Sequence, residues 1–350
     1  MTAPDTLPIS VVIPAFNAER VIGRAIASIK AQTRAAGEIV VVDDGSTDGT
    51  AAAARNAGVR VLRQLNRGSG EARNSGVRAA RYPWIAFLDA DDAWLPARLE
   101  VQWPAVQRSP DARLICADFD YVSEVSGVRR PNYMRSQPAY RNARRTKIAP
   151  NTSLIERGDA GRALVNGNFV GTSTLLVAAE LILNDGFFLA RSELRSTELC
   201  EEAEDAEWLL RVLRRTDLLA IERSLGTYFA QPGSVSESVG RMRYGDVKLG
   251  ERILADPRRY VAGIERQIVR VREPRQREAA LEFLRSGKSG HALAVAEEAY
   301  AEHRSIACGA LLFATRLLGT GAGRAAREAT RSVWKSRRVL LDESARRPRA

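Results

Sequence analysis

The sequence predicts an α/β fold: a mostly parallel sheet flanked by helices, followed by a helical C-terminal extension. Three observations lead to this prediction. Short β-branched runs recur through the first 120 residues, alanine-rich segments with helical spacing separate them, and strand signals end near Tyr244. Strands that alternate with helices run parallel, because the chain returns to the same edge of the sheet through each helix.

The expected strands follow one another at regular intervals. They are Ser10–Ile13, Ile39–Val42, Val59–Leu62, Trp84–Leu88 and Arg113–Ala117. In the helix expected after the first strand, the apolar positions are Val21, Ala25, Ile26 and Ile29, and in the helix expected after the third they are Ala72, Val77 and Ala80.

Carboxylates follow two of these strands directly. Asp43 and Asp44 come after the second strand, and Asp89 and Asp91 after the fourth. The carboxyl ends of parallel strands meet at one edge of a sheet, where ligands of such folds bind. Helix capping needs one polar residue per helix, such as Asp48 or Asp92 here. Because the carboxylates exceed that need, and because like charges repel, we expect a bound divalent cation or a cationic ligand.

The spacing of Asp89 and Asp91 favours a particular ion. Two hard oxygen ligands at a strand end suit Mg²⁺ or Mn²⁺ that also carries a substrate diphosphate and water. Neither a P-loop nor a dinucleotide-binding glycine motif follows the first strand. Phosphate would therefore be held largely through the metal.

Five motifs in order resemble glycosyltransferase family 2. They are Val12–Asn17, Val42–Asp48, Asn66 with Gly68, Ala72–Gly76 and Phe87–Asp92. The resemblance implies a GT-A (Rossmann-like) fold, a nucleotide-diphosphate sugar donor, a divalent metal (Mn²⁺ or Mg²⁺) and inversion at the anomeric carbon. It suggests a GT-A domain at 1–240, with a nucleotide-sugar-binding half at 1–120 and an acceptor half at 121–240. Residues 241–350 would form a basic α-helical extension.

The same resemblance implies site residues. Asp89 and Asp91 would bind the metal, and Asp44 would accept a hydrogen bond from the nucleobase. Gly68 and Gly76 could equally serve turns and helix–sheet packing. The residues expected to bind the nucleotide sugar are Pro14, Ala15, Asn17, Glu19, Asp43, Asp44, Gly68, Arg73, Asp89 and Ala90.

The acidic run Glu201–Glu207 resembles the family's Glu-Asp pair at the start of a helix, whose aspartate is the general base. Asp205 is the candidate, with Glu204 as the substitute. The alternative is a solvated first helical turn, favoured by the helix dipole, for Glu201, Glu202 and Glu207. The apolar face of this helix would be Ala203, Ala206, Leu209, Leu210 and Leu213.

The segment Tyr228–Ser236 is similar to the closing motif of the family, Tyr-Arg-x-His. Phe229 stands at the arginine position and Gln231 at the histidine position. The histidine can help bind metal or diphosphate in relatives, so either the Gln231 amide or water would take its place.

Together these features predict a metal-dependent inverting glycosyltransferase. It would move one sugar from a UDP- or dTDP-sugar to a hydroxyl of a glycan or lipid-linked acceptor in cell-surface polysaccharide synthesis. No Q-x-x-R-W motif is present, which argues against a processive synthase. The alternative is a non-catalytic module of the same fold that binds sugar nucleotides or carbohydrates.

The C-terminal part holds the excess positive charge. The formal net charge is +11, and residues 241–350 carry 24 basic against 13 acidic residues. Within 304–340 the apolar positions Ile306, Ala310, Phe313 and Leu317 accompany eight basic residues and one acid. This pattern fits binding to an anionic membrane surface, or packing on the catalytic domain or a second subunit. Nucleic acid is not expected, because the tail lacks interleaved aromatic residues and any recognition motif.

Few residues could build a disulfide scaffold or a zinc site. Cys116, Cys200 and Cys308 lie far apart, and His291 and His303 are the only histidines. We find no signal peptide and no membrane-spanning run, so we expect a cytoplasmic protein, peripheral at the inner membrane face if the tail binds lipid. Residues 122–170 show little periodicity and could be an acceptor-side loop or an ordinary insertion.

Overall fold

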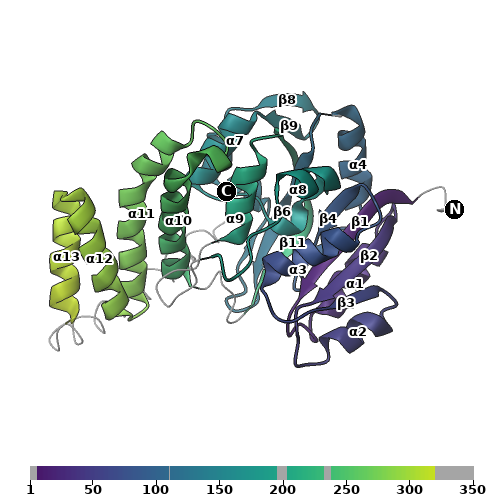
Figure 1. The fold of residues 1–350 in the computed structure, drawn as a ribbon, viewed down its shortest axis with the longest axis horizontal. Coiled ribbons are helices and arrows are strands. Elements are labelled where there is room, and N and C mark those ends of the chain that lie inside the picture. The colour runs from purple at the N-terminus through teal and green to yellow at the C-terminus, as the bar shows by residue number, and fades with distance from the viewer. Residues whose placement is uncertain (1–5, 110, 195–202, 232–237, 320–350) are drawn as a thin grey trace, which may run out of the picture.

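The computed structural model describes residues 6–109, 111–194, 203–231 and 238–319. It confirms the predicted α/β fold: an eleven-stranded sheet lies between helices, and further helices extend to one side (Figure 1). All five expected strands form, most of them longer than the apolar runs. They are β1 (Leu7–Ala15), β2 (Ala36–Asp43), β3 (Arg60–Arg63), β4 (Trp84–Phe87) and β6 (Leu114–Ser123).

The sheet is mixed, but most of its strands run in one direction. The strand order is β3-β2-β1-β4-β10-β6-β11-β9-β8, and the first four strands are parallel. β10 (Leu176–Ala178) is antiparallel to both β4 and β6, and β6 is parallel to β11 (Leu218–Ala230). The carboxyl ends of β1, β2, β4, β6 and β11 therefore share one edge of the sheet.

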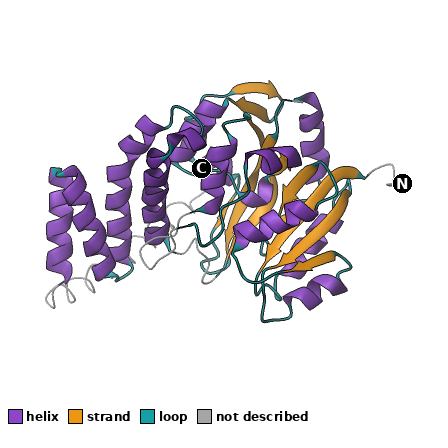
Figure 2. Cartoon of the chain, viewed as in Figure 1, coloured by secondary structure: helices purple, strands orange, loops and turns teal. Residues whose placement is uncertain are grey.

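Helices cover both faces of the sheet, as Figure 2 shows. On one face, α1 (Ile22–Lys30) and α4 (Arg98–Arg108) pack on alternate residues of the strands, and α2 (Thr50–Asn56) lies beside them. On the other face lie α3 (Ser69–Ala79), α7 (Arg157–Asn166), α8 (Ala179–Asp185) and α9 (Glu204–Val212). The apolar positions predicted for α1 and α3 are buried at Ala25, Ile26, Ile29, Ala72 and Val77.

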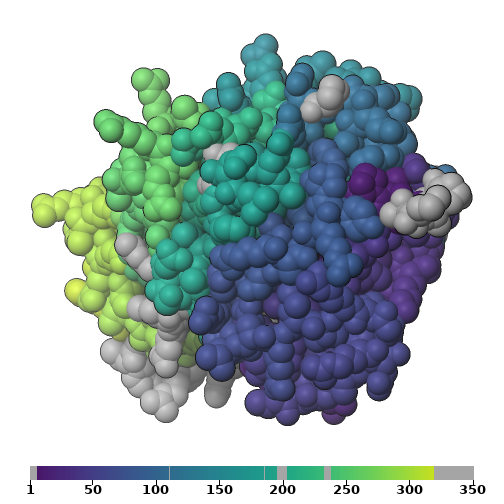
Figure 3. Space-filling model, turned by 45° about the vertical axis from the view of Figure 1, so that its right-hand side comes forward, coloured from purple at the N-terminus to yellow at the C-terminus, as the bar shows by residue number. Residues whose placement is uncertain are grey.

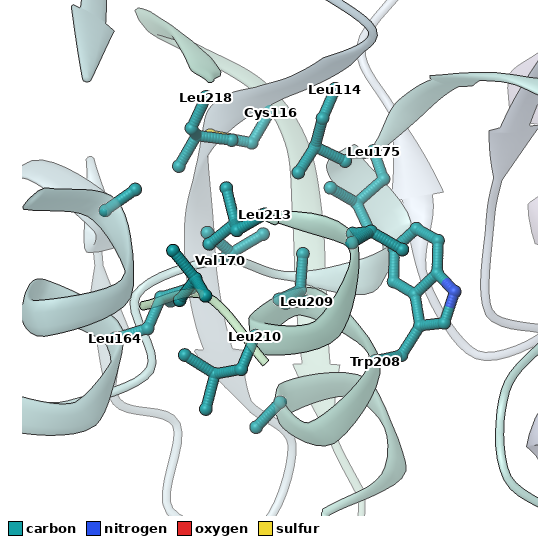
Figure 4. Packing of buried hydrophobic residues seen from close by; sticks show 14 of the residues in the cluster. Leu114, Cys116, Leu164, Val170, Leu175, Trp208, Leu209, Leu210, Leu213 and Leu218 are labelled. Atoms are coloured by element: carbon teal, nitrogen blue, oxygen red, sulfur yellow. The ribbon is translucent and has the colours of Figure 1, made fainter. Parts of the chain in front are cut away.

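The main core surrounds α9. The fully buried Trp208 stacks on Phe188 with ring centroids 4.5 Å apart and meets Phe87 edge to face. Leu209, Leu210 and Leu213 are buried beside it, as predicted (Figure 4). This packing fixes the start of α9 relative to the end of β4.

Residues 122–170 hold more regular structure than their weak periodicity predicted. Each element is short, which explains why the sequence pattern does not show it. The elements are β7 (Arg129–Arg130), α5 (Tyr133–Ser136), α6 (Pro138–Arg141), β8 (Thr146–Ala149), β9 (Thr152–Ile155) and α7. β5 (Ala93–Trp94) pairs with β11.

The chain after β11 is helical, as predicted. Its helices are α10 (Val239–Ala255), α11 (Glu265–Arg285), α12 (Ser289–His303) and α13 (Ile306–Gly319). Leu249 and Ile268 join the main core, whereas Phe283 and Val295 belong to a separate core. The space-filling view in Figure 3 shows these helices and the N-terminal strands at opposite sides of the molecule. The boundary at residue 240 stays a prediction.

Part of the predicted basic tail, residues 320–350, lies outside the described residues, as do Glu201, Glu202 and Cys200. Among the helices that the structure describes, none has the length and hydrophobicity needed to cross a membrane.

Candidate functional site

The expected acidic residues lie at the shared carboxyl edge of the strands. Asp43 ends β2, and Asp89 and Asp91 follow β4. β1 lies between these two strands and brings Pro14 and Ala15 to the same edge.

Asn17 and Glu19 connect the loops that follow β1 and β2. The backbone N–H of Asn17 donates to Ser46 Oγ at 3.0 Å, and the N–H of Thr47 donates to Asn17 Oδ1 at 2.9 Å. Glu19 Oε2 accepts from the N–H of Gly49 at 3.1 Å. In this structure both predicted ligand-binding side chains therefore shape the loops.

Asp44 anchors the loop that leads into α3. Its carboxylate is almost fully buried and accepts from Gln64 Nε2 at 2.7 Å and from the backbone N–H groups of Arg67 and Gly68 at 3.0 and 2.8 Å. Gly68 has φ +94°, a conformation that favours glycine. Asp43 accepts from the N–H of Ser46 and pairs with Arg63 at 3.2 Å.

Arg73 lies at the centre of the site. Its Nη2 donates to Asp89 Oδ1 and its Nη1 to Glu204 Oε1, both at 2.6 Å, and the side chain is 6% exposed. Burial alone would lower the pKa of Arg73, but these two carboxylates raise it above its usual value. Ser69 also donates to Glu204. One buried cation thus joins the end of β4 to the start of α9.

Three aspartates follow one another closely after β4. Burial and the charge of Asp89 raise the pKa of Asp91 to about 6, and the same causes, with the charge of Asp91 added, raise that of Asp92 well above its usual value. Ser173 connects the turn, because its hydroxyl accepts from the N–H of Asp89 at 3.0 Å and donates to Asp92. Asp92 does not cap a helix as predicted, since α4 begins at Arg98 and Asp92 accepts from the N–H of Phe229.

Asp205, the candidate base, lies in the first turn of α9 beside Glu204. Burial and the charge of Glu204 raise its pKa to about 6. Asn168 Nδ2 donates to Asp205 Oδ2 at 3.3 Å. The alternative of a solvated turn is wrong for Glu207, which is fully buried and pairs with Arg211 at 2.9 Å.

A divalent cation fits the donor chemistry of this edge. Two carboxylates, Asp89 and Asp91, stand two residues apart, and burial together with the charge of Asp89 raises the pKa of Asp91, a cost that a bound cation would offset. Within the described part of the chain, no three His, Cys, Asp or Glu side chains are grouped to hold a metal ion. Phosphate oxygens and water would therefore complete the coordination of a bound ion.

The closing segment contacts the same turn. The guanidinium of Arg24 lies 3.7 Å from the ring centre of Phe229 and donates to the backbone carbonyl of Asp91 at 2.6 Å. Within the part of the chain that the structure describes, Gln231 Nε2 is buried without a hydrogen-bond partner. A buried donor of this kind could serve a phosphate oxygen.

Sequence reasoning missed three residues that position the predicted ones. They are Arg24, Asn168 and Ser173, which contact Asp91, Asp205 and Asp89 respectively. None of the three stands in a motif, so the sequence held no signal for them.

Residues 10–160 match the model of the family described as Glycosyl transferase family 2. Among curated relatives, the succinoglycan biosynthesis protein ExoU of Rhizobium meliloti is 44% identical over 105 residues, which is 28% of this chain and 30% of the relative. The UDP-Glc:alpha-D-GlcNAc-diphosphoundecaprenol beta-1,3-glucosyltransferase WfgD of Escherichia coli is 35% identical over 102 residues, 28% of this chain and 40% of WfgD. The chain thus matches less than half the length of these relatives.

Two solved structures share the fold over most of the chain. S. aureus TarS 1-349 in complex with UDP-GlcNAc has a TM-score of 0.56 at 17% identity and covers 91% of this chain and 92% of its own. The mannosyltransferase PcManGT from Pyrobaculum calidifontis, in complex with GDP-Man and Mn²⁺, has a TM-score of 0.53 at 16% identity. The match covers 94% of this chain and 87% of PcManGT. Residues 10–160 of this chain therefore carry a domain of glycosyl transferase family 2, and the acidic strand edge lies within that region.

Proposed function

We propose that the chain is a metal-dependent inverting glycosyltransferase that transfers one sugar from a nucleotide-diphosphate sugar to a hydroxyl group. One observation carries the proposal. Arg73 binds two carboxylates at once. One is Asp89, which is predicted to bind the nucleotide sugar and the metal, and the other is Glu204, the neighbour of the predicted base. The two halves of the chain thus bring their carboxylates to one place, as a transfer between two substrates requires.

The chemistry needs one base. The acceptor oxygen forms a bond to the anomeric carbon while the bond from that carbon to the diphosphate oxygen breaks, and the acceptor proton passes to a carboxylate. Asp205 suits this step, because a pKa of about 6 leaves it ionised at neutral pH yet makes it a stronger base than an ordinary aspartate. Asn168 and the helix start hold its two oxygens in place.

Asp89 and Asp91 would hold a divalent cation, Mn²⁺ or Mg²⁺, which supplies positive charge to the departing diphosphate. Gln231 Nε2, buried and without a partner among the described residues, would donate to the same phosphate group. Asp43, Asp44, Asn17, Glu19 and Gly68 would surround the nucleotide, together with Pro14 and Ala15. Asp44 would need to exchange part of its loop contacts for a nucleobase.

The relatives indicate the class of donor and acceptor. WfgD is named for UDP-glucose and a diphosphoundecaprenol-linked sugar, and TarS was solved with UDP-GlcNAc. We infer a UDP- or dTDP-sugar donor for this chain and a glycan or lipid-linked acceptor in polysaccharide synthesis. ExoU, named for succinoglycan biosynthesis, supports the same process.

A lipid-linked acceptor agrees with the exposed face of α13. Ile306, Phe313 and Leu317 are 93%, 68% and 53% exposed and share one side of the helix with Ala310. The opposite side packs through Cys308 and Leu311, so among the described residues this stripe does not pack on the catalytic domain. We propose that the stripe inserts into an anionic membrane surface beside Arg316.

Calorimetry with UDP, dTDP, GDP and CDP, each with Mn²⁺ and with EDTA, tests the proposed function. We expect one uridine or thymidine diphosphate to bind only with Mn²⁺, and Asp91→Asn to remove that binding. Asp111→Asn, which changes an exposed aspartate, is the matched control and should bind normally. Metal-independent binding would favour the alternative of a non-catalytic module, and no binding at all would contradict both.

A further inference from the structure

Four aromatic side chains cluster where β6 and β11 end. Phe119 and Tyr121 come from β6, Tyr228 from β11 and Tyr133 from α5. Tyr121 and Tyr228 are register partners on the adjacent strands, and their stacked rings lie 5.7 Å apart with planes at 18°. The ring centroid of Tyr133 lies 5.8 Å from that of Tyr121, on which it stacks, and 5.0 Å from that of Phe119.

The cluster is layered. Phe119 is buried beneath, whereas Tyr121, Tyr133 and Tyr228 are partly exposed. Within the part of the chain that the structure describes, the hydroxyls of Tyr121 and Tyr133 make no hydrogen bond, so both are available to a ligand. Rings that served packing alone would bury their faces and pair their hydroxyls. Tyr121 and Tyr133 instead combine apolar ring surface with hydroxyls that no described residue binds.

A single segment, Asn168–Thr174, joins the cluster to the proposed reaction centre. Its first residue donates to Asp205, its Gly171 lies against the ring of Phe119, and its Ser173 accepts from the N–H of Asp89. A side chain at Gly171 would place its Cβ 3.1 Å from Phe119, so the glycine permits this close approach. The aromatic cluster therefore borders the side of the site where the acceptor hydroxyl must meet its base.

We propose that Tyr121, Tyr133 and Tyr228 form the subsite for a sugar ring of the acceptor. The faces of pyranose rings carry polarised C–H groups, which the negative face of an aromatic ring attracts, while tyrosine hydroxyls bind the sugar's own hydroxyls. The acceptor is then a saccharide or glycolipid whose terminal sugar stacks here. The inference rests on the proposed transferase function, since it assigns the second substrate of the same site.

Saturation-transfer NMR on the full chain, with the nucleotide and Mn²⁺ present, tests the subsite. The probes are the octyl β-glycosides of glucose, galactose, mannose and N-acetylglucosamine. We expect saturation on the ring C–H protons of at least one probe, and about tenfold weaker binding in Tyr121→Ala. Tyr121→Phe should keep most of the binding because it keeps the ring. Tyr300→Ala, which removes an exposed ring on α12, should bind like the wild type.

Two outcomes overturn the inference while nucleotide binding stays intact. One is that none of the four probes receives saturation in the wild-type protein, and the other is that Tyr121→Ala binds as well as the wild type. If Tyr121→Ala does not fold, Tyr133→Ala decides by the same criterion, since Tyr133 lies in a short helix outside the sheet. Loss of all nucleotide binding in the wild type contradicts the proposed function instead, so the two failures are distinguishable.

Discussion

Arg73 and Glu204 lie 131 residues apart in the chain, yet Arg73 Nη1 donates to Glu204 Oε1 at 2.6 Å. The same guanidinium binds Asp89 at an equal distance. α3 thus joins the strand that carries the predicted metal ligands to the helix that carries the predicted base. Together with the packing of Trp208, this cation sets the position of Asp205 relative to Asp89.

Arg73→Ala should therefore lower both stability and activity. It leaves two partly buried carboxylates, Asp89 and Glu204, without their cation, which costs about 3 kcal/mol of unfolding free energy. Urea unfolding measures the change. Arg78→Ala, on the same helix, removes a pair with Glu71 in which the arginine side chain is 47% exposed, and it should cost less than about 1 kcal/mol. Equal losses in the two variants would show that the Arg73 bridge has no special role.

The carboxylates at the sheet edge could be predicted because of how strands are built. Buried parallel strands read as continuous apolar runs, and the residue after each run stands at the ligand edge. This rule alone is enough to predict that Asp43 and Asp89 lie at the ligand edge. The pairing of Arg73 with Glu204 could not be predicted, because it depends on how α9 packs through Trp208 against Phe188.

Two errors have the same physical origin. Glu207 has the sequence environment of a solvated helical turn, but the packing of α9 buries it, and Arg211 neutralises it one turn later. Asp92 has the position of a helix cap, but it binds Ser173 and the backbone of Phe229. Distant segments, which local periodicity does not reveal, bury Glu207 in the first case and supply the partners of Asp92 in the second.

The rate of sugar transfer should fall as the pH drops below about 6. The base must be ionised to accept a proton, and the pKa of Asp205 is raised to about 6 by burial and by Glu204, against the opposing charge of Arg73. The initial rate at saturating metal and donor, measured from pH 5 to 9, gives the profile. Asp205→Asn should lose about 10²- to 10⁴-fold in kcat. If Glu204→Gln abolishes transfer while Asp205→Asn does not, Glu204 is the base.

The substitution Asp205→Asn should stabilise the folded protein. An aspartate whose pKa is higher in the folded than in the unfolded state binds more protons when folded, so its ionisation costs stability as the pH rises from about 4 to 6. Asp205→Asn removes this cost and should raise the unfolding free energy at pH 8 by about 1 to 2 kcal/mol, since partial exposure screens the charge. Near pH 3.5 the two proteins should differ little. A destabilised variant at pH 8 would contradict the raised pKa.

Gly76 serves the packing of α3 on the sheet, one of its two predicted roles. A Cβ at this position would lie 2.3 Å from Val12 Cγ1, so Gly76→Ala should push α3 away from β1 and cost about 1 to 3 kcal/mol. Gly23→Ala, in the exposed side of α1 with nothing within 4 Å, should instead stabilise by about 0.5 to 1 kcal/mol. Thermal unfolding of both variants measures the contrast. Loss of stability in both would mean that α1 has less room than the structure shows.

Binding to anionic vesicles should depend on the exposed stripe of α13. Phe313 is 68% exposed, and transfer of such a side chain into the acyl boundary is worth about 2 kcal/mol, so Phe313→Ser should weaken binding to phosphatidylglycerol vesicles more than tenfold. Val269→Ser changes a similarly exposed apolar residue on α11 (61%), outside the stripe, and should leave binding unchanged. Sedimentation with vesicles at 0.1 M salt gives both values. If the wild-type chain does not sediment with the vesicles, the stripe faces a partner other than a membrane, and Phe313→Ser should then alter the state of association measured by light scattering.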